Sequence, residues 1–450
     1  MNRRELALLL PLLVLYLAAW AVFPDRSDDE ASYVVLAQRL VDGYYVTGND
    51  DAILDADPAS PDLWFGPGLP ALQAPLVAVG APVSVLRLTS LFVLFAAVLL
   101  MYVLARERWG ARVGLVAAYA LGLYLPFLNL LSNLHSEVLA VLFVVVGMLG
   151  LARYIERGTA VWLAVGGLGL AGLALTRVAY GWVLTVAAVL LAVWWLIGRG
   201  RGTLRALGVV ALALALCLPW LAYTYAKTDR LLVWGNSGSL SLYWMTSPHP
   251  GDLGDWHQAH LVFSDPDLRP HRAFFETLRG LDLPEQNARI ERQALRNIAD
   301  HPASYAQNVA ANVSRMLFNW PYSRTPFQTN DLFFMLSNVV LLAAVMFSLI
   351  VLVPRRRTLP PEAGVFVLLA GTAFVLHALV SAYPRMLVPI VPPVVWLTVL
   401  AAVEVGLLRP SAERGTRDPS RSPAAAPAAR ARRARPARPG GRRGSVRRAC

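Results

Sequence analysis

The sequence predicts an all-α polytopic membrane protein with about ten transmembrane helices. Of its 450 residues, 56% are hydrophobic and only 16% are charged, and the mean hydropathy is +0.49. Apolar runs of about the length of a bilayer crossing recur from the N-terminus to residue 408. This composition excludes a soluble enzyme, a collagen-like chain, a disulfide scaffold and a disordered chain.

Most of the positive charge lies in a C-terminal tail. The formal charge is +12, and residues 409–450 alone contain 13 arginines against two acidic residues. The tail is rich in Ala, Pro and Arg and has almost no large apolar side chains, so we expect it to be disordered. Its charge is better explained by anionic membrane lipids on the cytoplasmic side than by a nucleic acid. We therefore expect a membrane domain over residues 1–408 and no nucleic-acid partner.

Ten apolar segments are expected to cross the membrane, namely residues 6–23, 83–105, 113–131, 138–152, 161–175, 179–197, 204–225, 332–353, 363–382 and 387–408. The first has a basic start, as a signal peptide does, but its 18 residues exceed the usual signal-peptide core. Residues 66–82 are apolar but contain four prolines and are too short to cross, which favours a re-entrant or interfacial element.

The arginines predict the orientation. Clusters fall on alternate connections, at residues 3–4, 106–112, 153–157, 199–205 and 355–357. Because translocated arginine is disfavoured, these clusters and the tail are expected in the cytoplasm, with both termini on that side of the cell membrane. Two large loops then lie outside the cytoplasm, at residues 24–65 and 227–330. The first is acidic, with ten acidic residues against two arginines.

Three consecutive acids, Asp28, Asp29 and Glu30, follow the first predicted span closely. A carboxylate at the membrane surface can accept a proton from an acceptor hydroxyl or hold a divalent metal ion. The other interpretation is a solvated acidic turn that caps the following helix, because Asp favours helix N-termini. The residues alone do not decide between these two interpretations. They also do not decide whether the protein requires a metal ion.

Three further charges lie at the outer ends of predicted spans. Glu137 begins one span, and a carboxylate there usually has a partner or a task, unless it only caps the helix. Arg177 and Arg385 are exceptions to the positive-inside tendency. A planar guanidinium suits a phosphate in the outer leaflet, whereas contact with lipid phosphates alone is the alternative.

The second loop provides no motif of its own. His257 and His260 lack the acidic residues of a zinc-protease motif, so ordinary surface histidines are expected. Residues 284–318 alternate charged and apolar positions at near-helical spacing, which predicts amphipathic helices lying on the membrane.

The order of these motifs resembles the GT-C glycosyltransferases that use polyprenyl-phosphate sugars, a group that includes protein O-mannosyltransferases and lipid A aminoarabinose transferases. The matching pieces run through nearly the whole membrane domain. They are Asp29-Glu30-Ala31-Ser32-Tyr33, the segment from Gly66-Pro67-Gly68 to Pro75-Leu76, Arg106 to Gly110, Ser136-Glu137, Gly172 to Arg177, Leu218-Pro219-Trp220, His301-Pro302 with Tyr305, and Arg385 to Pro389.

The resemblance implies a catalytic acid in the first outer loop, which we assign to Asp29 with Asp28 and Glu30 as neighbours. The family often has a second acid in the next outer loop, and Glu137 occupies that position, although many relatives have aspartate there. Arg177 and Arg385 are then expected to bind the donor phosphate. If these arginines do not bind it, the donor phosphate is expected to bind Lys227, Arg230 or a metal ion held by Asp28, Asp29 and Glu30.

The expected function is therefore an inverting membrane glycosyltransferase, a hexosyl- or pentosyltransferase of the cell envelope. It would move a sugar from a polyprenyl-phosphate donor to a lipid, glycan or protein acceptor on the extracytoplasmic face. The alternative is a transporter or flippase of lipid-linked sugars. Inverted repeats and charges at mid-membrane would favour that alternative, and neither is evident in the sequence.

Overall fold

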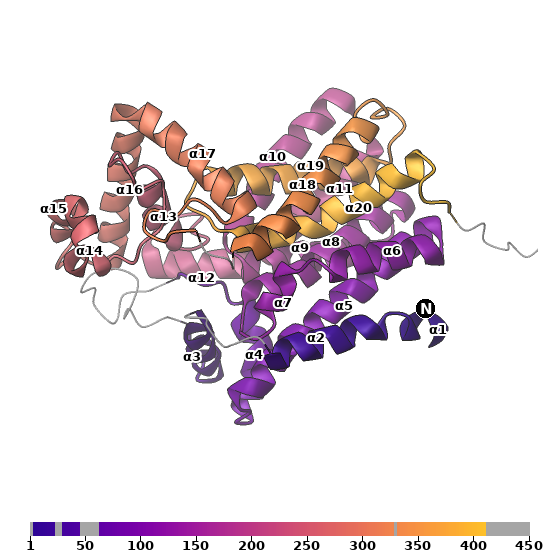
Figure 1. Ribbon diagram of the computed structural model, residues 1–450, viewed down its shortest axis with the longest axis horizontal. Coiled ribbons are helices and arrows are strands. Elements are labelled where there is room, and N and C mark those ends of the chain that lie inside the picture. The colour runs from indigo at the N-terminus through magenta and orange to yellow at the C-terminus, as the bar shows by residue number, and fades with distance from the viewer. Residues whose placement is uncertain (1–2, 23–28, 46–62, 328–330, 411–450) are drawn as a thin grey trace, which may run out of the picture. The chain divides into compact units, whose positions relative to one another are not determined.

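The computed structural model describes residues 3–22, 29–45, 63–327 and 331–410, and within them it contains helices and no strand (Figure 1). The helices up to the second outer loop are α1 (Arg3–Ala7), α2 (Leu10–Val22), α3 (Asp29–Val41), α4 (Gly68–Ala78), α5 (Val83–Trp109), α6 (Ala111–Gly122), α7 (Pro126–Leu130), α8 (Ser136–Arg157), α9 (Ala160–Thr176), α10 (Ala179–Gly198), α11 (Arg201–Leu216) and α12 (Leu218–Thr228). The others are α13 (Ser237–Met245), α14 (Leu261–Ser264), η1 (Pro266–His271), α15 (Arg272–Glu276), α16 (Leu283–Asp300), α17 (Pro302–Phe318), α18 (Asp331–Leu352), α19 (Pro361–Ala378), η2 (Pro384–Ile390) and α20 (Val391–Glu404).

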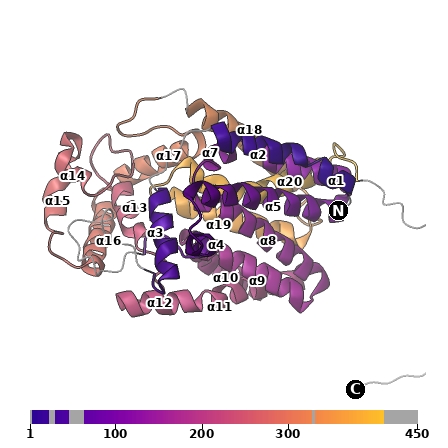
Figure 2. The same ribbon diagram turned by 90° about the horizontal axis from the view of Figure 1, so that it is seen from below.

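The predicted all-α polytopic class is confirmed. Among the described residues, each of the ten predicted segments is mostly helical, and seven helices are long and apolar enough to cross a membrane when α1 with α2 and η2 with α20 are each counted as one. Helices α11 and α12, bent by 43° at their junction, together make an eighth. Helices α6 and α9 are shorter, at 12 and 17 residues, so the predicted count of ten depends on these two. The predicted re-entrant segment forms α4, an 11-residue helix that packs beside α3 (Figure 2).

Helices α8 and α9 form the most extensive helix pair of the described chain. They run antiparallel, and their connection begins at Gly158, whose φ of 70° suits glycine. A Cβ added at Gly169 would lie 2.5 Å from the backbone nitrogen of Gly147, and one at Gly150 would overlap the backbone of Gly166. Because the two backbones touch without intervening side chains, the register is fixed, and the start of α8 lies beside the end of α9.

The arginine clusters gather at the opposite end of these helices. Near the C-terminal end of α5, Arg106 lies 3.3 Å from Glu5 of α1, and Arg108 Nη1 lies 2.5 Å from Glu362 at the start of α19. The alternation of arginines along the sequence therefore corresponds to one end of the helix bundle. The predicted tail lies outside the described residues from residue 411 onward.

The described part of residues 227–330 folds into helices with a core of its own. Buried apolar side chains of α13, α16 and the segments between them form this core. We expected the apolar stripe of α16 to face the membrane, but Ile290 and Ala294 are buried against this core instead. Short helices cannot bury their apolar faces alone, so α16 pairs with α13.

The glycine contact makes a testable prediction. Gly169→Ala should overpack the α8–α9 interface, at a cost of about 1–3 kcal/mol, and lower the melting temperature of the purified protein in detergent. Gly371→Ala is the matched control, because a Cβ at this glycine of α19 meets nothing within 4 Å. Equal melting temperatures for the two variants would contradict the close contact.

Candidate functional site

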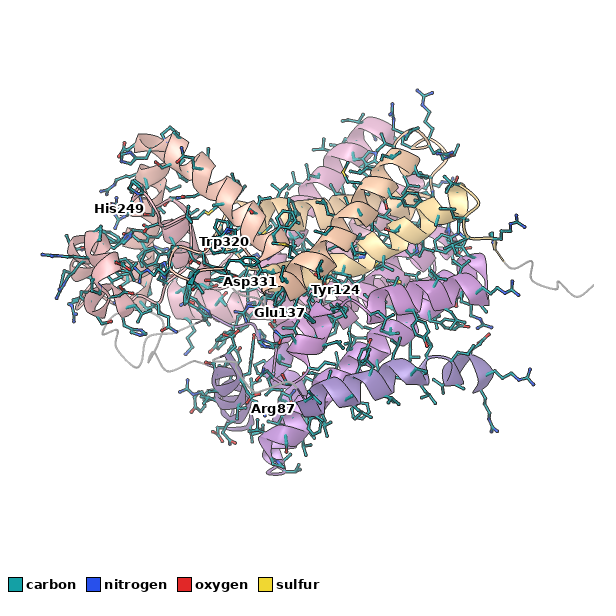
Figure 3. The ribbon with its side chains drawn as sticks, in the orientation of Figure 1. Arg87, Tyr124, Glu137, His249, Trp320 and Asp331 are labelled. Carbon is teal, nitrogen blue, oxygen red and sulfur yellow. The ribbon has the colours of Figure 1, made fainter. Side chains whose placement is uncertain are left out.

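The centre of the candidate site is Glu137, in the first turn of α8. Its side chain is only 1% exposed, and an ionised carboxylate with so little water needs a cation close by. The α8–α9 register supplies one, since Arg177 directly follows the last residue of α9. Its Nη1 donates a hydrogen bond of 2.6 Å to Oε1 of Glu137. Figure 3 labels Glu137 and shows its place among the helices.

Arg385 extends this ion pair into a chain of four alternating charges. It lies at the start of η2, and its Nε is 3.5 Å from the same Oε1 of Glu137. Its Nη1 donates to Oδ2 of Asp29 at 2.5 Å. Asp29 begins α3, so the chain joins Asp29, Arg385, Glu137 and Arg177 in that order, with a formal charge of zero. Asp29 and Arg385 are 26% and 33% exposed, so this end of the chain is accessible to solvent.

Glu30 is held by a separate cation. The guanidinium of Arg87, in α5, donates to both carboxylate oxygens of Glu30, at 2.8 and 2.6 Å, and the backbone N–H of Leu134 adds a third hydrogen bond of 3.2 Å. Glu30 thereby ties α3 to α5 and to the turn that precedes Glu137. Arg87 was not among the site residues expected from the sequence, although a cation inside an apolar span was a visible signal.

The segment Gly66-Pro67-Gly68 supports the end of α9 that carries Arg177. A Cβ at Gly66 would overlap the carbonyl oxygen of Leu175, and one at Gly68 would overlap Oγ1 of Thr176. Only glycine lets this segment cross the helix end so closely. On its other side, Arg177 Nη2 contacts the sulfur of Met386, next to Arg385 in the chain. The loop with two glycines therefore has a positional role beside the ion pairs.

Two neutral polar groups flank the chain of charges. Tyr33, one turn after Asp29, packs its ring against Phe65 with 4.7 Å between ring centres. Burial, and then the charge of Asp29, raise the pKa of Tyr33, so its hydroxyl stays protonated. Burial lowers the pKa of His135 although Glu137 lies 4.0 Å away, so this imidazole stays neutral near pH 7. Neither group therefore adds a charge to the chain of Asp29, Arg385, Glu137 and Arg177.

Not every predicted site residue joins this cluster. Asp28 lies outside the described residues. Lys227, in the last turn of α12, and Arg230, just beyond that helix, are exposed. Lys227 lies over the ring of Tyr223, 5.8 Å from its centre, and neither cation takes part in the hydrogen bonds and ion pairs seen for the four-residue chain.

The described residues contain no group of three His, Cys, Asp or Glu side chains placed to hold a metal ion. Asp29 and Glu30 are adjacent in sequence but face different arginines. The expectation for His257 was wrong, because this histidine is buried rather than at the surface. Its Nε2 lies 3.1 Å from Oγ of Ser323, inside the packing between the outer helices and the bundle.

The exposure of the four charges indicates what the chain can do. Glu137 is buried and suited to holding the two guanidiniums in place, whereas the Asp29–Arg385 pair is open to a ligand. An anion can take hydrogen bonds from the guanidinium of Arg385 in competition with Asp29. The carboxylate released in this way is a proton acceptor beside the bound anion. The Asp29–Arg385 pair thus has the chemical groups that anion binding and general-base chemistry require.

No protein-family model matches the chain, and no curated protein matches its sequence. Among solved structures, the archaeal oligosaccharyltransferase AglB from Archaeoglobus fulgidus, in complex with an inhibitory peptide and a dolichol-phosphate, is similar with a TM-score of 0.50 and 16% identity. This match covers 90% of the present chain and 50% of AglB. The Archaeoglobus fulgidus oligosaccharyltransferase in its apo form is similar with a TM-score of 0.52, 14% identity, and coverage of 89% and 50%.

The arabinosyltransferase EmbB from Mycobacterium smegmatis also aligns, with a TM-score of 0.36, 19% identity, and coverage of 90% of the present chain and 42% of EmbB. The chain thus spans about half the length of the oligosaccharyltransferase that it matches. At these identities the likeness concerns the fold. The resemblance stated for the sequence motifs predicted this likeness of fold, and the chain shares the fold of the matched half of this oligosaccharyltransferase.

Proposed function

We propose that the protein is a membrane glycosyltransferase that moves a sugar from a polyprenyl-phosphate donor to an acceptor on the extracytoplasmic face. The observation that carries this proposal is the solvent-accessible Asp29–Arg385 pair at the end of the buried charge chain. One partner can bind a phosphate while the other accepts a proton. The dolichol-phosphate in the AglB complex adds support, because a structure of similar fold contains a lipid phosphate.

The charges suit an inverting transfer. The acceptor oxygen attacks C1 of the sugar, the bond from C1 to the phosphate oxygen breaks, and the acceptor proton passes to Asp29. The donor is a phosphodiester, and the polyprenyl phosphate that leaves is a phosphomonoester with one more negative charge. Because Asp29 becomes neutral when it accepts the proton, one negative charge moves from Asp29 to the phosphate. Arg385 contacts Asp29 and is placed to stabilise the charge at both positions. No charge has to enter or leave the site during the step.

The other acids then have supporting roles. Glu137 accepts from Arg177 and lies close to Arg385, so it keeps the two guanidiniums together at one surface of the site. Glu30 is engaged by Arg87 on both oxygens and holds α3 in place. Three of the acids expected to be catalytic lie in the described residues, namely Asp29, Glu30 and Glu137. The side chain of Asp29 is the most exposed of the three, so an acceptor reaches it most readily.

We predict that Asp29→Asn abolishes sugar transfer while expression and membrane insertion stay normal. The amide keeps the shape of the carboxylate but cannot accept the acceptor proton. The measurement is transfer of radiolabel from polyprenyl-phosphate sugars into lipid, glycan or protein by purified protein in liposomes. Asp42→Asn is the matched control, an exposed acid of the same loop bonded only to Gln38 among the hydrogen bonds of the described residues.

Full turnover by the Asp29→Asn variant would contradict the general-base role. The same assay separates the transporter alternative, because a flippase moves labelled donor across the bilayer without forming a new product. Addition of a chelator in a parallel reaction tests whether the acids of α3 hold a metal ion. Retained activity in the chelator would exclude this role.

We predict that Arg177→Ala and Arg385→Ala raise the donor KM more than the acceptor KM. A charge-assisted hydrogen bond to a phosphate in a partly dry site contributes about 1.5–3 kcal/mol, which corresponds to about tenfold or more. Lysine in place of either arginine should restore donor use only in part, because it lacks the planar fork. Donor titration at saturating acceptor measures the effect, and Arg272→Ala, an exposed arginine paired with Glu276, is the control. Unchanged donor dependence in both variants would rule out the phosphate-binding role.

We also propose that both termini are cytoplasmic and the site is extracytoplasmic, on the basis of the arginine alternation. A phosphatase reporter fused near Ser264 should be active, and one fused at Arg356 or Ser411 should be silent. An active reporter at Arg356 together with an active one at Ser264 would mean that the span between Leu332 and Val353 has been miscounted.

A further inference from the structure

The buried face of α17 is polar. Asn308, Asn312 and Arg315 are spaced by four and three residues, so they form one stripe along the helix. All three are buried, and Asn312 and Arg315 are completely so. A helix expected to lie on the membrane through its apolar residues therefore directs polar side chains into the protein. Such groups are costly to bury unless their hydrogen bonds are made.

Asn312 bonds to the last two residues of α19 and to the connection that follows this helix. Its amide nitrogen donates to the carbonyl oxygens of His377, Ala378 and Val380, at 3.1, 3.1 and 2.7 Å. Its amide oxygen accepts from the backbone N–H of Ala382 at 2.9 Å. A single side chain thus pairs both donor and acceptor groups of a segment that is not helical between residues 379 and 383.

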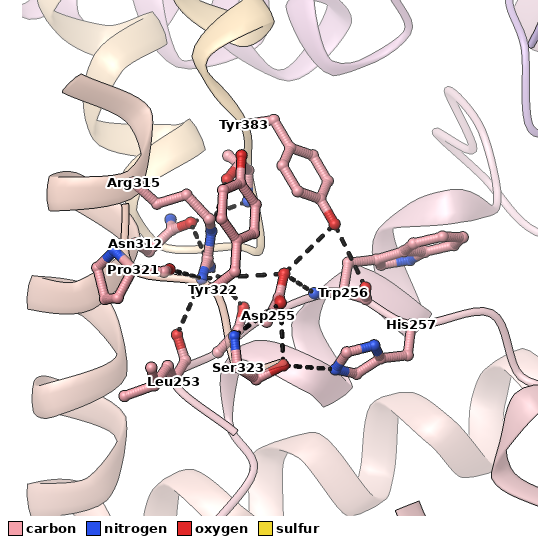
Figure 4. A network of polar contacts seen from close by, with 12 residues as sticks. Leu253, Asp255, Trp256, His257, Asn312, Arg315, Pro321, Tyr322, Ser323 and Tyr383 are labelled. Carbon is pink, nitrogen blue, oxygen red and sulfur yellow. Dashed lines mark hydrogen bonds and ion pairs between the residues drawn. The ribbon is translucent and has the colours of Figure 1, made fainter. Parts of the chain in front are cut away.

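Arg315 joins the same connection to the segments around Leu253 and Pro321 (Figure 4). Its Nε donates to the carbonyl oxygen of Ala382 at 3.3 Å. Its two terminal nitrogens donate to Oδ1 of Asn312 and to three backbone carbonyls, those of Leu253, Gly254 and Pro321. Asp255 lies 3.9 Å from Nη1 and compensates the buried charge. The guanidinium is therefore a rigid junction of three chain segments.

Asp255 closes the network on the far side of the connection. The hydroxyl of Tyr383 donates to Oδ1 of Asp255 at 3.4 Å and lies 3.3 Å from the carbonyl oxygen of Trp256. The other carboxylate oxygen accepts from the backbone N–H and the hydroxyl of Ser323, at 3.1 and 3.0 Å. The connection is thus held at its start by Asn312 and at its end by Tyr383. Two residues later the chain reaches Arg385.

We propose that Asn312 and Arg315 are positioning residues for Arg385. They hold the connection between α19 and η2 so that one guanidinium meets both Asp29 and Glu137. The proposal rests on the phosphate-binding role proposed above for Arg385. Its physical basis is that irregular backbone has no helix to define its path, and a catalytic group displaced by about 1 Å can lose about 100-fold in rate. The stripe on α17 supplies the missing constraint.

The test compares two asparagines of the same stripe. Asn312→Ala should lower kcat/KM for the donor by about 10- to 100-fold through a higher donor KM, with the acceptor KM changed by less than about twofold. Asn308→Ala is the matched control. Asn308 is equally part of the buried face, but it donates only to the carbonyl oxygens of Met245 and Ser247, away from the connection. We expect this control to lower thermal stability and to leave the donor KM within about twofold of wild type.

Arg315→Lys is the second variant, in case Asn312→Ala folds poorly. Lysine keeps a positive charge beside Asp255 but has three donors for the five acceptors of the guanidinium, so the donor KM should rise here too. A rise in donor KM as large in Asn308→Ala as in Asn312→Ala would overturn the proposal, because a general structural role would then explain both.

Hydrogen–deuterium exchange of residues 379–386 gives a readout that needs no activity. The amide of Ala382 should exchange faster in Asn312→Ala than in wild type or Asn308→Ala, because its acceptor is removed. Unchanged exchange would overturn the positioning role, and so would faster exchange with wild-type donor kinetics. If the wild-type protein transfers no sugar from any donor tested, the proposed function fails, and exchange alone then decides whether Asn312 holds the connection.

Discussion

A carboxylate almost without solvent lies at the end of the helix bundle where α8 begins and α9 ends, and its neutralisation governs the arrangement around it. Glu137 is charged only if a cation is at hand, and the end of α9 provides Arg177. A second guanidinium, Arg385, would leave excess positive charge without Asp29 on its other side. The helix register and the two-glycine loop hold Arg177, and the polar stripe of α17 binds the connection that leads to Arg385.

The rigidity of these supports differs along the chain. Arg177 is held by helix backbones in direct contact and by a loop that tolerates no Cβ at Gly66. Arg385 is held by side-chain hydrogen bonds to irregular backbone, from Asn312 and Arg315. The buried end of the chain is therefore held by packed backbones, and the end open to solvent by a network of side-chain hydrogen bonds.

The members of the charge chain were predictable because each is a charge where an apolar span begins or ends. Each of the four is a charged residue beside an apolar segment, namely Asp29, Glu137, Arg177 and Arg385. The alternation of arginine clusters predicts that all four lie on the same side of the membrane. Which acid pairs with which arginine was not predictable, because Asp29 and Arg385 lie at opposite ends of the sequence. Lys227 and Arg230 had the right chemistry, but α12 leads them away to the surface.

The polar stripe of α17 illustrates a different limit. Its apolar residues predicted a helix on the membrane, but Asn312 and Arg315 find backbone partners that only the tertiary fold brings near. The same holds for Arg87, whose partner Glu30 is on another helix. The spacing of residues along the sequence indicates which of them share one face of a helix. The tertiary packing determines which face is buried.

The short connection between α8 and α9 has a consequence for biosynthesis. The two helices form a hairpin closed by Gly158, so Glu137 and Arg177 come together as soon as the second helix leaves the translocation channel. The nascent chain then carries a neutral pair into the lipid instead of two isolated charges. Arg385 is synthesised much later, after all but the last spanning helix. Assembly of the complete charge chain is thus among the final events of membrane integration.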